Sequence, residues 1–351
     1  PSILTGIAPV QPLNLKVKAP LLWQWAAAAD MHSFFFTSHD PTWLGLGPFI
    51  TTPPPDKSWD QRDDGLPPYR DMGCDDHFTV DRAVQHLESL ANSSRPFLGV
   101  VHLNVNHYPY NTRPEYRRWT GSDLDLYDNT ILETDTHTRR LFETLERTGQ
   151  LDRTVILFAS DHGEGFNEHG YIAHFYCHFV ETVAVPLWLY LPGSFAAGCD
   201  LSVLRGNQAA TVQNLDLLPT LLDCIGAWDH PGVARFRAPM MGGSLFRPLA
   251  PDRTVWITNT NEVMPSVIGL SSITGRWHYM LRTSGTPPLE DLYDLESDPH
   301  ERHNLWPQTS PQDRDRYRRS FLQFPVAARM MTAAFPHLAP ADQSPPRQGE
   351  P

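Results

Sequence analysis

One apolar run limits the folds open to this chain. The segment Thr154–Ser160 is apolar and rich in β-branched residues, and Asp161-His162-Gly163-Glu164 follows it directly. A short run of this kind is typical of a buried strand, and open α/β enzymes carry their chemistry in the turns after such strands. The pattern therefore predicts an α/β protein with functional groups at the end of a strand.

The rest of the first two thirds alternates between apolar runs and helical periodicity. We expect strands at Ser33–Thr37, Phe97–Leu103 and Val185–Leu191, and helices at Ala19–Asp30, Thr79–Leu90, Tyr127–Leu145 and Asp216–Gly226. Alternation of this kind predicts a mainly parallel sheet flanked by helices. Asp216 is a candidate N-cap of its helix, with Pro219 in the first turn. Asp135 is a carboxylate on the apolar face of its helix, where a structural hydrogen bond is the first interpretation and a catalytic role the second.

After about Arg235 the pattern changes to short strands without long helices between them. We expect strands at Thr254–Thr258, Ser266–Leu270, Arg276–Arg282 and Asp291–Leu295, then a helix at Gln312–Gln323. These predict a small antiparallel α+β subdomain. The predicted organisation is a catalytic domain at 1–235, a C-terminal subdomain at 236–335 and a disordered tail at 336–351. The stretch from Trp43 to Asp76, rich in Pro, Gly and Asp, predicts a long irregular surface loop that either faces substrate or is a solvated insertion.

Composition excludes one class of partner. The 351 residues carry a formal net charge of −12 without a cluster of Lys and Arg, which argues against a surface that tracks nucleic-acid phosphates. The four cysteines form no metal-binding or redox motif, and one or two disulfide bridges remain open. Because the sequence starts at Pro1, the absence of a signal or membrane segment proves nothing.

Histidines gather around the ends of two predicted strands. His102 lies at the end of one strand and His107 follows it, while His162, His169, His174 and His178 follow the other. Strand ends at one edge of a sheet converge, so His107 and His174 are candidates to hold an oxyanion or protonate a leaving alkoxide. Asp161 and His162 are candidate ligands of a divalent cation, whose other ligands must lie elsewhere. For Glu164, His169 and His178 we expect supporting contacts around the site.

These motifs, in their order and spacing, resemble the sulfatase branch of the alkaline-phosphatase superfamily. The matching segments are Ser160–Gly170, the helix Tyr127–Asp135, His107-Tyr-Pro-Tyr110, Val185–Gly193, Asp216–Leu222 and Leu292–Leu305. The resemblance spans the chain from Pro1 to about Trp306. It implies the alkaline-phosphatase-like fold, with Asp161 and His162 as metal ligands and with His107 and His174 at positions that contact the transferred group. It implies one divalent metal ion, for which His162 suits Mn²⁺ or Zn²⁺ better than Ca²⁺.

The resemblance also locates the attacking residue. The segment Pro1–Pro9 resembles the stretch just after the nucleophile of the family, so we expect the nucleophile, the first strand and its acidic metal ligand upstream of Pro1. The chain then corresponds to an N-terminally truncated catalytic domain. Ser2 and Thr5 are the available hydroxyls, but the family pattern places them after the nucleophile.

One position bears on the choice between sulfate and phosphate. Formylglycine sulfatases carry the pattern Cys/Ser-x-Pro-x-Arg, and if Pro1 is that proline, Ile3 replaces the arginine. Members with a Thr or Ser nucleophile, the phosphoethanolamine and phosphoglycerol transferases, lack that arginine. The stretch Asn106-His107-Tyr-Pro-Tyr110 resembles the lipoteichoic-acid-synthase type.

The sequence therefore predicts a metal-dependent hydrolase or transferase of phosphate or sulfate esters that acts through a covalent intermediate. Phosphoryl chemistry on a Thr or Ser nucleophile is the first expectation, a formylglycine sulfatase the second, and an inactive remnant the third. The expected partner is an ester substrate, with a lipid or a glycan as its alcohol. By resemblance we expect an extracytoplasmic protein, in the periplasm or cell envelope, anchored in the membrane through an upstream segment.

Overall fold

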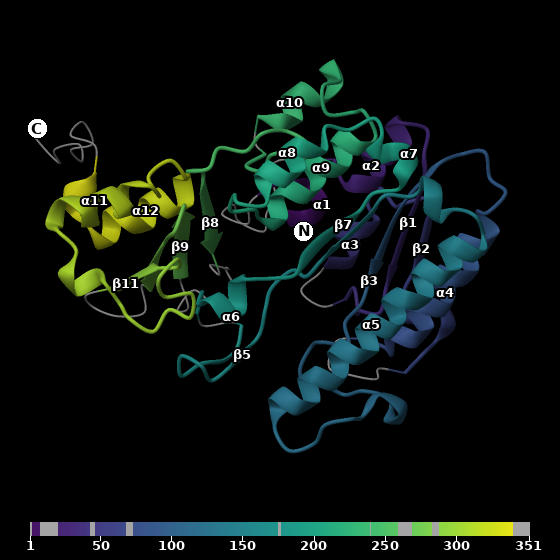
Figure 1. Ribbon diagram of the computed structural model, residues 1–351, viewed down its shortest axis with the longest axis horizontal. Helices are drawn as coiled ribbons and strands as arrows, with labels where there is room; N and C mark the ends of the chain where they lie inside the picture. Colours follow the sequence, from purple (N-terminus) through teal and green to yellow (C-terminus); the bar gives the residue numbers. More distant parts are fainter. Residues whose placement is uncertain are drawn as a thin grey trace, which may run out of the picture.

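The computed structural model describes residues 2–7, 20–42, 46–67, 73–174, 177–238, 240–258, 269–282 and 288–339. Figure 1 shows an α/β part, which holds the first two thirds of the chain, beside a smaller part built on an antiparallel sheet. Residues 340–351 of the predicted disordered tail and the start of the strand predicted at Ser266–Leu270 lie outside the described residues. The first residues of that tail, Pro336–Leu338, instead form a short 3-10 helix whose Leu338 is buried.

A parallel sheet lies at the centre of the α/β part. Strand β1 (His32–Thr37) pairs in parallel with β2 (Lys57–Trp59) on one side and β3 (Phe97–His102) on the other. The predicted strands Ser33–Thr37 and Phe97–Leu103 are confirmed. The expectation that 43–76 is irregular throughout was wrong, because β2 and helix α3 (Leu46–Thr51) lie within it.

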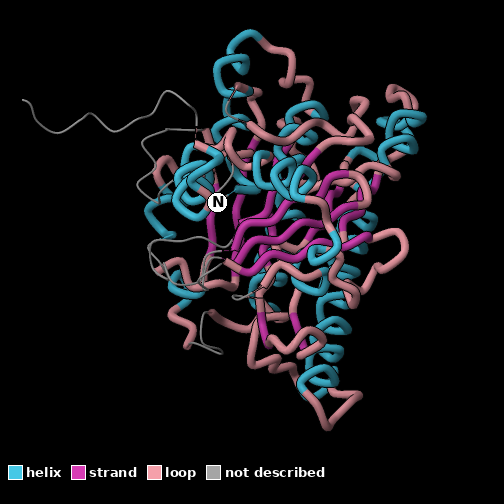
Figure 2. The backbone as a smooth tube through the Cα atoms, turned by 90° about the vertical axis from the view of Figure 1, so that its left-hand side faces the viewer, coloured by secondary structure: helices cyan, strands magenta, loops and turns pink. Residues whose placement is uncertain are grey.

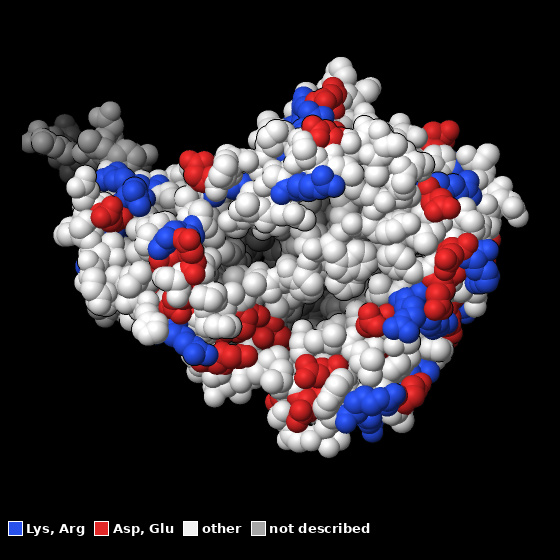
Figure 3. Space-filling view, in the orientation of Figure 1, with Lys and Arg blue, Asp and Glu red and all other residues white. Residues whose placement is uncertain are grey.

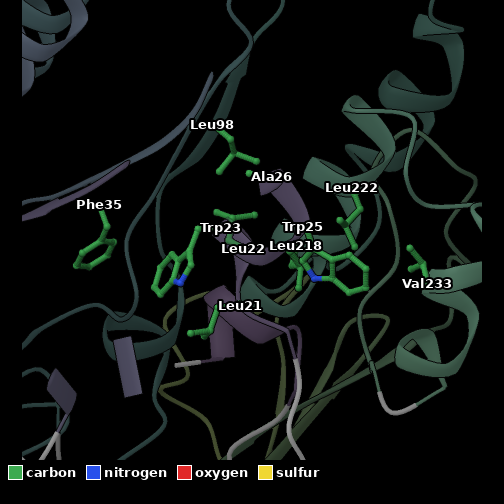
Figure 4. Close-up of a cluster of buried hydrophobic side chains, with 10 residues drawn as sticks. All are labelled: Leu21, Leu22, Trp23, Trp25, Ala26, Phe35, Leu98, Leu218, Leu222 and Val233. Carbon is green, nitrogen blue, oxygen red and sulfur yellow. The ribbon is translucent and has the colours of Figure 1, made fainter. Parts of the chain in front are cut away.

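Side chains of β1 alternate between two apolar layers. Phe35 packs on one face against α2 (Leu22–Ala28) and α9 (Leu217–Cys224), in the buried cluster drawn in Figure 4. Phe34 and Phe36 point to the other face, toward α4 (Asp76–Ser89) and α5 (Asp123–Arg147). Successive residues of a strand face opposite sides, so a run of phenylalanines fits a sheet covered by helices on both faces. Figure 2 shows the strands of the molecule gathered at its centre with helices around them.

The strands predicted at Thr154–Ser160 and Val185–Leu191 pair with each other, but in antiparallel rather than parallel direction. Strand β4 (Ile156–Ala159) pairs antiparallel with β7 (Leu187–Tyr190), and the four residues of β4 are half-buried rather than buried. The connection between them holds the hairpin β5 (Gly165–Phe166) and β6 (Ile172–Ala173) and the short helix α6 (Val180–Val183). Two neighbouring parallel strands must be joined by a crossover connection, which is usually a long helix. The described part of the connection from β4 to β7 contains no long helix, in keeping with their antiparallel pairing.

The described residues of the α/β part also form the α-helices α1 (Ser2–Thr5), α7 (Gly193–Ala196), α8 (Leu201–Asn207) and α10 (Ala234–Arg237). Across the described ranges, no helix combines the length and the apolar character that crossing a membrane requires.

The C-terminal part is a four-stranded antiparallel sheet, as predicted. Its strands are β8 (Thr254–Thr258), β9 (Gly269–Thr274), β10 (Trp277–Arg282) and β11 (Leu289–Asp294), in the order β11-β10-β9-β8. Helix α11 (Pro311–Arg319) is shorter than expected, and α12 (Pro325–Ala334) was not predicted. Tyr279, Phe321 and Met331 form the core between sheet and helices, each at most 1% exposed. Figure 3 shows a hollow near the centre of the molecular face, between the two parts.

A buried glutamate joins the C-terminal part to α6. One carboxylate oxygen of Glu301 accepts from the backbone N–H of Val180 at 2.7 Å, and the other pairs with His278 Nδ1. His169 Nε2 lies 3.2 Å from the backbone carbonyl of Glu301, and its Nδ1 lies 2.8 Å from Glu181 Oε1. Glu301 is 1% exposed, so these contacts form away from water. The segment between β4 and β7 is thereby attached to the C-terminal sheet.

Asp216 does not cap its helix. Its carboxylate accepts from the backbone N–H groups of Gln213 and Gly243 and pairs with both terminal nitrogens of Arg253, at 3.0 and 2.9 Å. Asp216 is 0% exposed, and such a charge is retained only with full compensation. Instead of capping α9, Asp216 forms a buried ion pair with Arg253. This pair holds Arg253, just before β8, against the start of α9.

Asp135 was also placed wrongly. Its side chain is 66% exposed and pairs with Arg139 one turn along α5, so it does not lie on the apolar face. The buried residues of α5 instead include Glu133 and His137. Neither residue belongs to the helical repeat that placed Asp135 on the apolar face.

The contrast between Asp216 and Asp135 gives a test of stability. Replacing Asp216 with Ala leaves the Arg253 cation in a mostly buried position, so we expect Asp216→Ala to lower the free energy of unfolding by about 3–5 kcal/mol. Asp135→Ala breaks an exposed pair and should cost less than about 0.5 kcal/mol. Urea unfolding of both variants checks this, and equal losses would contradict the assignment.

The second prediction concerns His86. Burial on α4 against Phe34 and Phe36, and then the neighbouring His32, lower the pKa of His86 to about 4. The unfolded chain, with a pKa near its ordinary 6.5, therefore binds more protons between these values. Stability should be greatest above pH 6.5, fall as the pH drops toward 4, and level off below. We expect His86→Gln to remove about 2–3 kcal/mol of this dependence, measured by urea unfolding at several pH values. His178, whose burial lowers its pKa to about 3, should retain its own contribution.

Candidate active site

The candidate site lies where strands of the α/β part end. Asp161 and His162 follow β4, His107 lies a short loop after β3, and His174 follows β6 directly. The local sequence explains this placement, since each apolar strand gives way to polar residues that cannot continue a buried sheet.

The structure brings all four predicted side chains together. The His162 and His174 rings are stacked, with centroids 3.7 Å apart and an interplanar angle of 25°. His107 meets His174 edge to face, with centroids 6.1 Å apart. Asp161 Oδ2 lies 3.7 Å from His162 Nε2. The convergence that the sequence predicted for two strand ends is present in the fold.

Hydrogen bonds fix how the histidines face the site. His162 Nδ1 lies 2.8 Å from the Gly163 carbonyl, and His107 Nδ1 lies 2.7 Å from the Tyr108 carbonyl. A carbonyl only accepts, so Nδ1 carries the proton in both rings. In neutral His162 the Nε2 lone pair is then directed away from the backbone, which is the state of a metal-binding imidazole whose other nitrogen donates to protein.

The buried Glu164 carboxylate contacts one of the clustered histidines, His174. It lies 3.1 Å from His174 Nδ1, and its side chain is 5% exposed. Burial and then the nearby Glu164 carboxylate raise the pKa of Tyr110. The supporting contact expected of Glu164 is present in the structure.

The backbone around Asp161 is held by side chains of its neighbours. Asn214 Nδ2 donates to the carbonyls of Ser160 and Asp161, each at 3.0 Å, and Ser160 Oγ donates to the His162 carbonyl at 2.7 Å. Burial alone would raise the pKa of Asp161, but His162, His102 and backbone N–H groups outweigh it and hold the pKa below its ordinary value. The side chain remains 64% exposed, so an ionised carboxylate meets solvent at the strand end.

Gly163 is required by close backbone packing. It does not adopt a positive φ, so its backbone conformation is not what requires glycine. A Cβ at this position would lie 2.2 Å from the carbonyl oxygen of Glu181, and the Gly163 N–H donates to the Thr182 carbonyl at 2.9 Å. The loop after β4 therefore packs directly on the backbone of α6.

His39 was missed by the sequence analysis. It follows β1 as the other site residues follow their strands, and its ring stacks on His102 with centroids 5.9 Å apart. Thr37 Oγ1 lies 2.9 Å from His102 Nδ1. Burial lowers the pKa of His39, which favours a neutral ring near His107 and Asp161. The polar residues after Ser33–Thr37 were the signal for its position.

His169 and His178 lie in other surroundings. His169 stacks on Phe179, with centroids 3.9 Å apart, while it bonds Glu181 and the C-terminal part. His178 is 6% exposed, and burial lowers its pKa to about 3. The described contacts of His169 join the two parts of the molecule rather than support His162 or His174.

Asp161 and His162 fit part of a cation site. Carboxylate oxygen and imidazole nitrogen are atoms that bind divalent ions, and here they lie side by side, with the proton of neutral His162 on Nδ1 and the lone pair of Nε2 free. Within the described segments, no group of three or more His, Cys, Asp or Glu side chains is arranged to hold a metal. These two residues alone do not provide a full set of ligands.

Solved structures define the class of the fold. The chain is similar to a protein in the alkaline phosphatase superfamily from Vibrio parahaemolyticus, with a TM-score of 0.64 and 17% identity, over 96% of this chain and 74% of that one. It is also similar to the lipoteichoic acid synthase LtaP from Listeria monocytogenes, with a TM-score of 0.64 and 14% identity, over 96% and 78% of the two chains. At these identities the likeness concerns the fold, which is that of the alkaline-phosphatase superfamily.

Sequence comparison narrows the class to a family. Residues 2–227 match the family model described as Sulfatase, and the chain belongs to the sulfatase family. A choline-sulfatase of Rhizobium meliloti (strain 1021) is 34% identical over 223 residues, which cover 61% of this chain and 37% of that protein. The chain thus spans little more than a third of the length of this curated relative.

The packing of Gly163 on α6 gives a prediction. We expect Gly163→Ala to lower the free energy of unfolding by about 1–3 kcal/mol, because the new methyl group displaces either the loop or the Glu181 carbonyl. Gly206→Ala is the matched control, since its Cβ would meet nothing within 4 Å inside α8. It should stabilise by about 0.5–1 kcal/mol. Urea unfolding of the two variants distinguishes the outcomes, and a neutral Gly163→Ala would show that the loop moves freely.

Proposed function

We propose that the protein hydrolyses sulfate esters with a divalent cation bound at Asp161 and His162. The observation that carries the proposal is the convergence of Asp161, His162, His107 and His174 at the strand ends of a sulfatase-family chain. The identity of 34% to a choline-sulfatase supports sulfate over phosphate.

The cation would offset negative charge on the nonbridging oxygens of the bound ester, which is the chemistry that a divalent ion supplies to such sites. Asp161 and His162 would hold it through a carboxylate oxygen and through Nε2. We propose a single ion, and Mn²⁺, Zn²⁺ and Ca²⁺ all remain candidates, with the imidazole ligand favouring the first two.

His107 and His174 would act on the ester itself. The Glu164 carboxylate at His174 Nδ1 balances positive charge on that ring, which suits His174 to donate a proton from Nε2 to the leaving alkoxide. His107, with Nδ1 bound to the Tyr108 carbonyl, presents Nε2 to the same space and would position the sulfuryl oxygens.

Neither nearby hydroxyl is assigned the attack on sulfur. Ser160 Oγ donates to the His162 carbonyl, and Thr5 is buried at 5% exposure. The proposal concerns the metal, the oxyanion and the leaving group, which are the parts of the reaction that these residues can serve.

A second candidate is phosphate-ester hydrolysis or transfer, the first expectation from the sequence. It is favoured by Ile3, which replaces the arginine of the formylglycine pattern if Pro1 is the proline of that pattern. The oxyanion and leaving-group chemistry derived above would serve either ester. An extracytoplasmic location and a glycan or lipid alcohol are proposed with both candidates.

The test compares an aryl sulfate with the matching aryl phosphate, using the purified full-length gene product. We expect a higher kcat/KM for the sulfate, with turnover abolished by a chelator and restored by added Mn²⁺, Zn²⁺ or Ca²⁺. His174→Ala should lower kcat on the order of 10²–10⁴-fold, because proton donation is lost. Asp161→Ala should in addition weaken metal binding measured by calorimetry, whereas the exposed Asp135→Ala should change neither quantity.

Three results would overturn parts of the proposal. Faster turnover of the phosphate would establish the second candidate, and chelator-insensitive turnover would remove the metal role of Asp161 and His162. Failure to turn over either ester, with metal present, would favour an inactive remnant.

A further inference from the structure

Two large apolar side chains are exposed beside the histidine cluster. Tyr108, the residue after His107, is 53% exposed, and Ile172, two residues before His174, is 61% exposed. Scattered exposed apolar residues are normal on protein surfaces and need no explanation. These two differ because both lie next to side chains that we assign to the substrate.

Buried and half-buried rings hold them in place. Tyr108 packs edge to face on Tyr110, which is 3% exposed, with centroids 5.6 Å apart. Tyr110 and Tyr127 both contact Phe166, at 5.7 and 5.1 Å, and Phe166 pairs with Ile172 across the β5–β6 hairpin. We call these five residues, Tyr108, Tyr110, Tyr127, Phe166 and Ile172, the aromatic shelf.

The shelf and the histidines share one support. The Glu164 carboxylate lies 3.1 Å from His174 Nδ1 and is also near enough to the Tyr110 hydroxyl to raise its pKa, so the shelf and the proposed proton donor adjoin the same carboxylate. Tyr110 has a φ of 57° and Ala173 a φ of 66°, a left-handed conformation that side chains adopt at a cost. Such strain is retained where the surroundings determine the conformation, as at binding sites.

We propose that the aromatic shelf binds the alcohol portion of the ester, and that this alcohol carries a six-membered ring, either aryl or pyranose. The inference rests on the proposed function, because it deepens the substrate class of the same site. Tyr108 is the exposed ring of the shelf, and a single exposed aromatic face suits a partner that presents one ring face of its own. Recognition of a quaternary ammonium group instead uses a cage of several aromatic faces.

The experiment measures KM and kcat of Tyr108→Ala and Tyr108→Phe in the full-length gene product. The substrates are 4-methylumbelliferyl sulfate, glucosamine 6-sulfate and choline-O-sulfate, or the corresponding phosphates if those are turned over faster. We expect Tyr108→Ala to raise KM for the ring esters roughly tenfold with little change in kcat, and Tyr108→Phe to restore the wild-type KM. Inhibition by inorganic sulfate, which lacks an alcohol, should remain unchanged.

Phe78→Ala is the control, since Phe78 is 39% exposed on α4 and lies outside the shelf. An unchanged KM for both ring esters in Tyr108→Ala would overturn the proposal. So would a loss confined to choline-O-sulfate, or an equal loss of inhibition by inorganic sulfate. A loss for one ring ester alone would support the proposal and identify the ring.

A binding measurement separates this inference from the proposed function. Fluorescence titration with 4-methylumbelliferone, the free aryl alcohol, reports on the shelf without any turnover. We expect binding roughly tenfold weaker in Tyr108→Ala than in the wild type or in Phe78→Ala. If neither ester is hydrolysed, the proposed function fails while this titration still decides the inference, and equal binding by all three proteins would overturn it.

Discussion

The short turn at 214–216 is the constraint on which the arrangement of this molecule depends. Asn214 holds the backbone carbonyls of Ser160 and Asp161, while Asp216 holds Arg253 at the entrance to the C-terminal sheet. The Asp216 carboxylate is fully buried and is neutralised by the Arg253 guanidinium and by backbone N–H groups. A buried charge tolerates little displacement once its partners are set, because any loosening leaves it uncompensated. The site loop and the C-terminal sheet are therefore fixed to one rigid point.

Much of the fold followed from the order of apolar runs and helical periods. The strands at Ser33–Thr37 and Phe97–Leu103 are read correctly because helices cover both faces of that sheet, so the strand sequences are almost wholly apolar. The antiparallel pairing of β4 with β7 could not be read in this way, since an apolar run does not encode the direction of its neighbour. Strand β2 was also missed, because Lys57-Ser58-Trp59 has no apolar run or alternation that predicts a strand. Its extended conformation is stabilised by pairing with β1.

The sequence predicted which residues form the candidate site better than it predicted the contacts that those residues make. Asp161, His162, His107 and His174 could be grouped because polar residues follow each predicted strand, and the histidine rings come together although β3, β4 and β6 belong to three separate sheets. The need for Gly163 depends on the Glu181 carbonyl, which approaches from a segment whose position only the tertiary fold determines. The burial of His39 and the exposure of Asp135 were likewise not predictable, because the sequence around a residue does not specify how deeply it is buried in the fold.

The bond from Glu301 to Val180 has a consequence for how the protein is made. The segment that carries His174 is fastened by a residue that the ribosome adds 121 residues after Val180. Domains generally fold as units during synthesis, in order from the N-terminus. The bond between Val180 and Glu301 joins residues 121 positions apart, so it can form only after the strands of the C-terminal sheet have been synthesised.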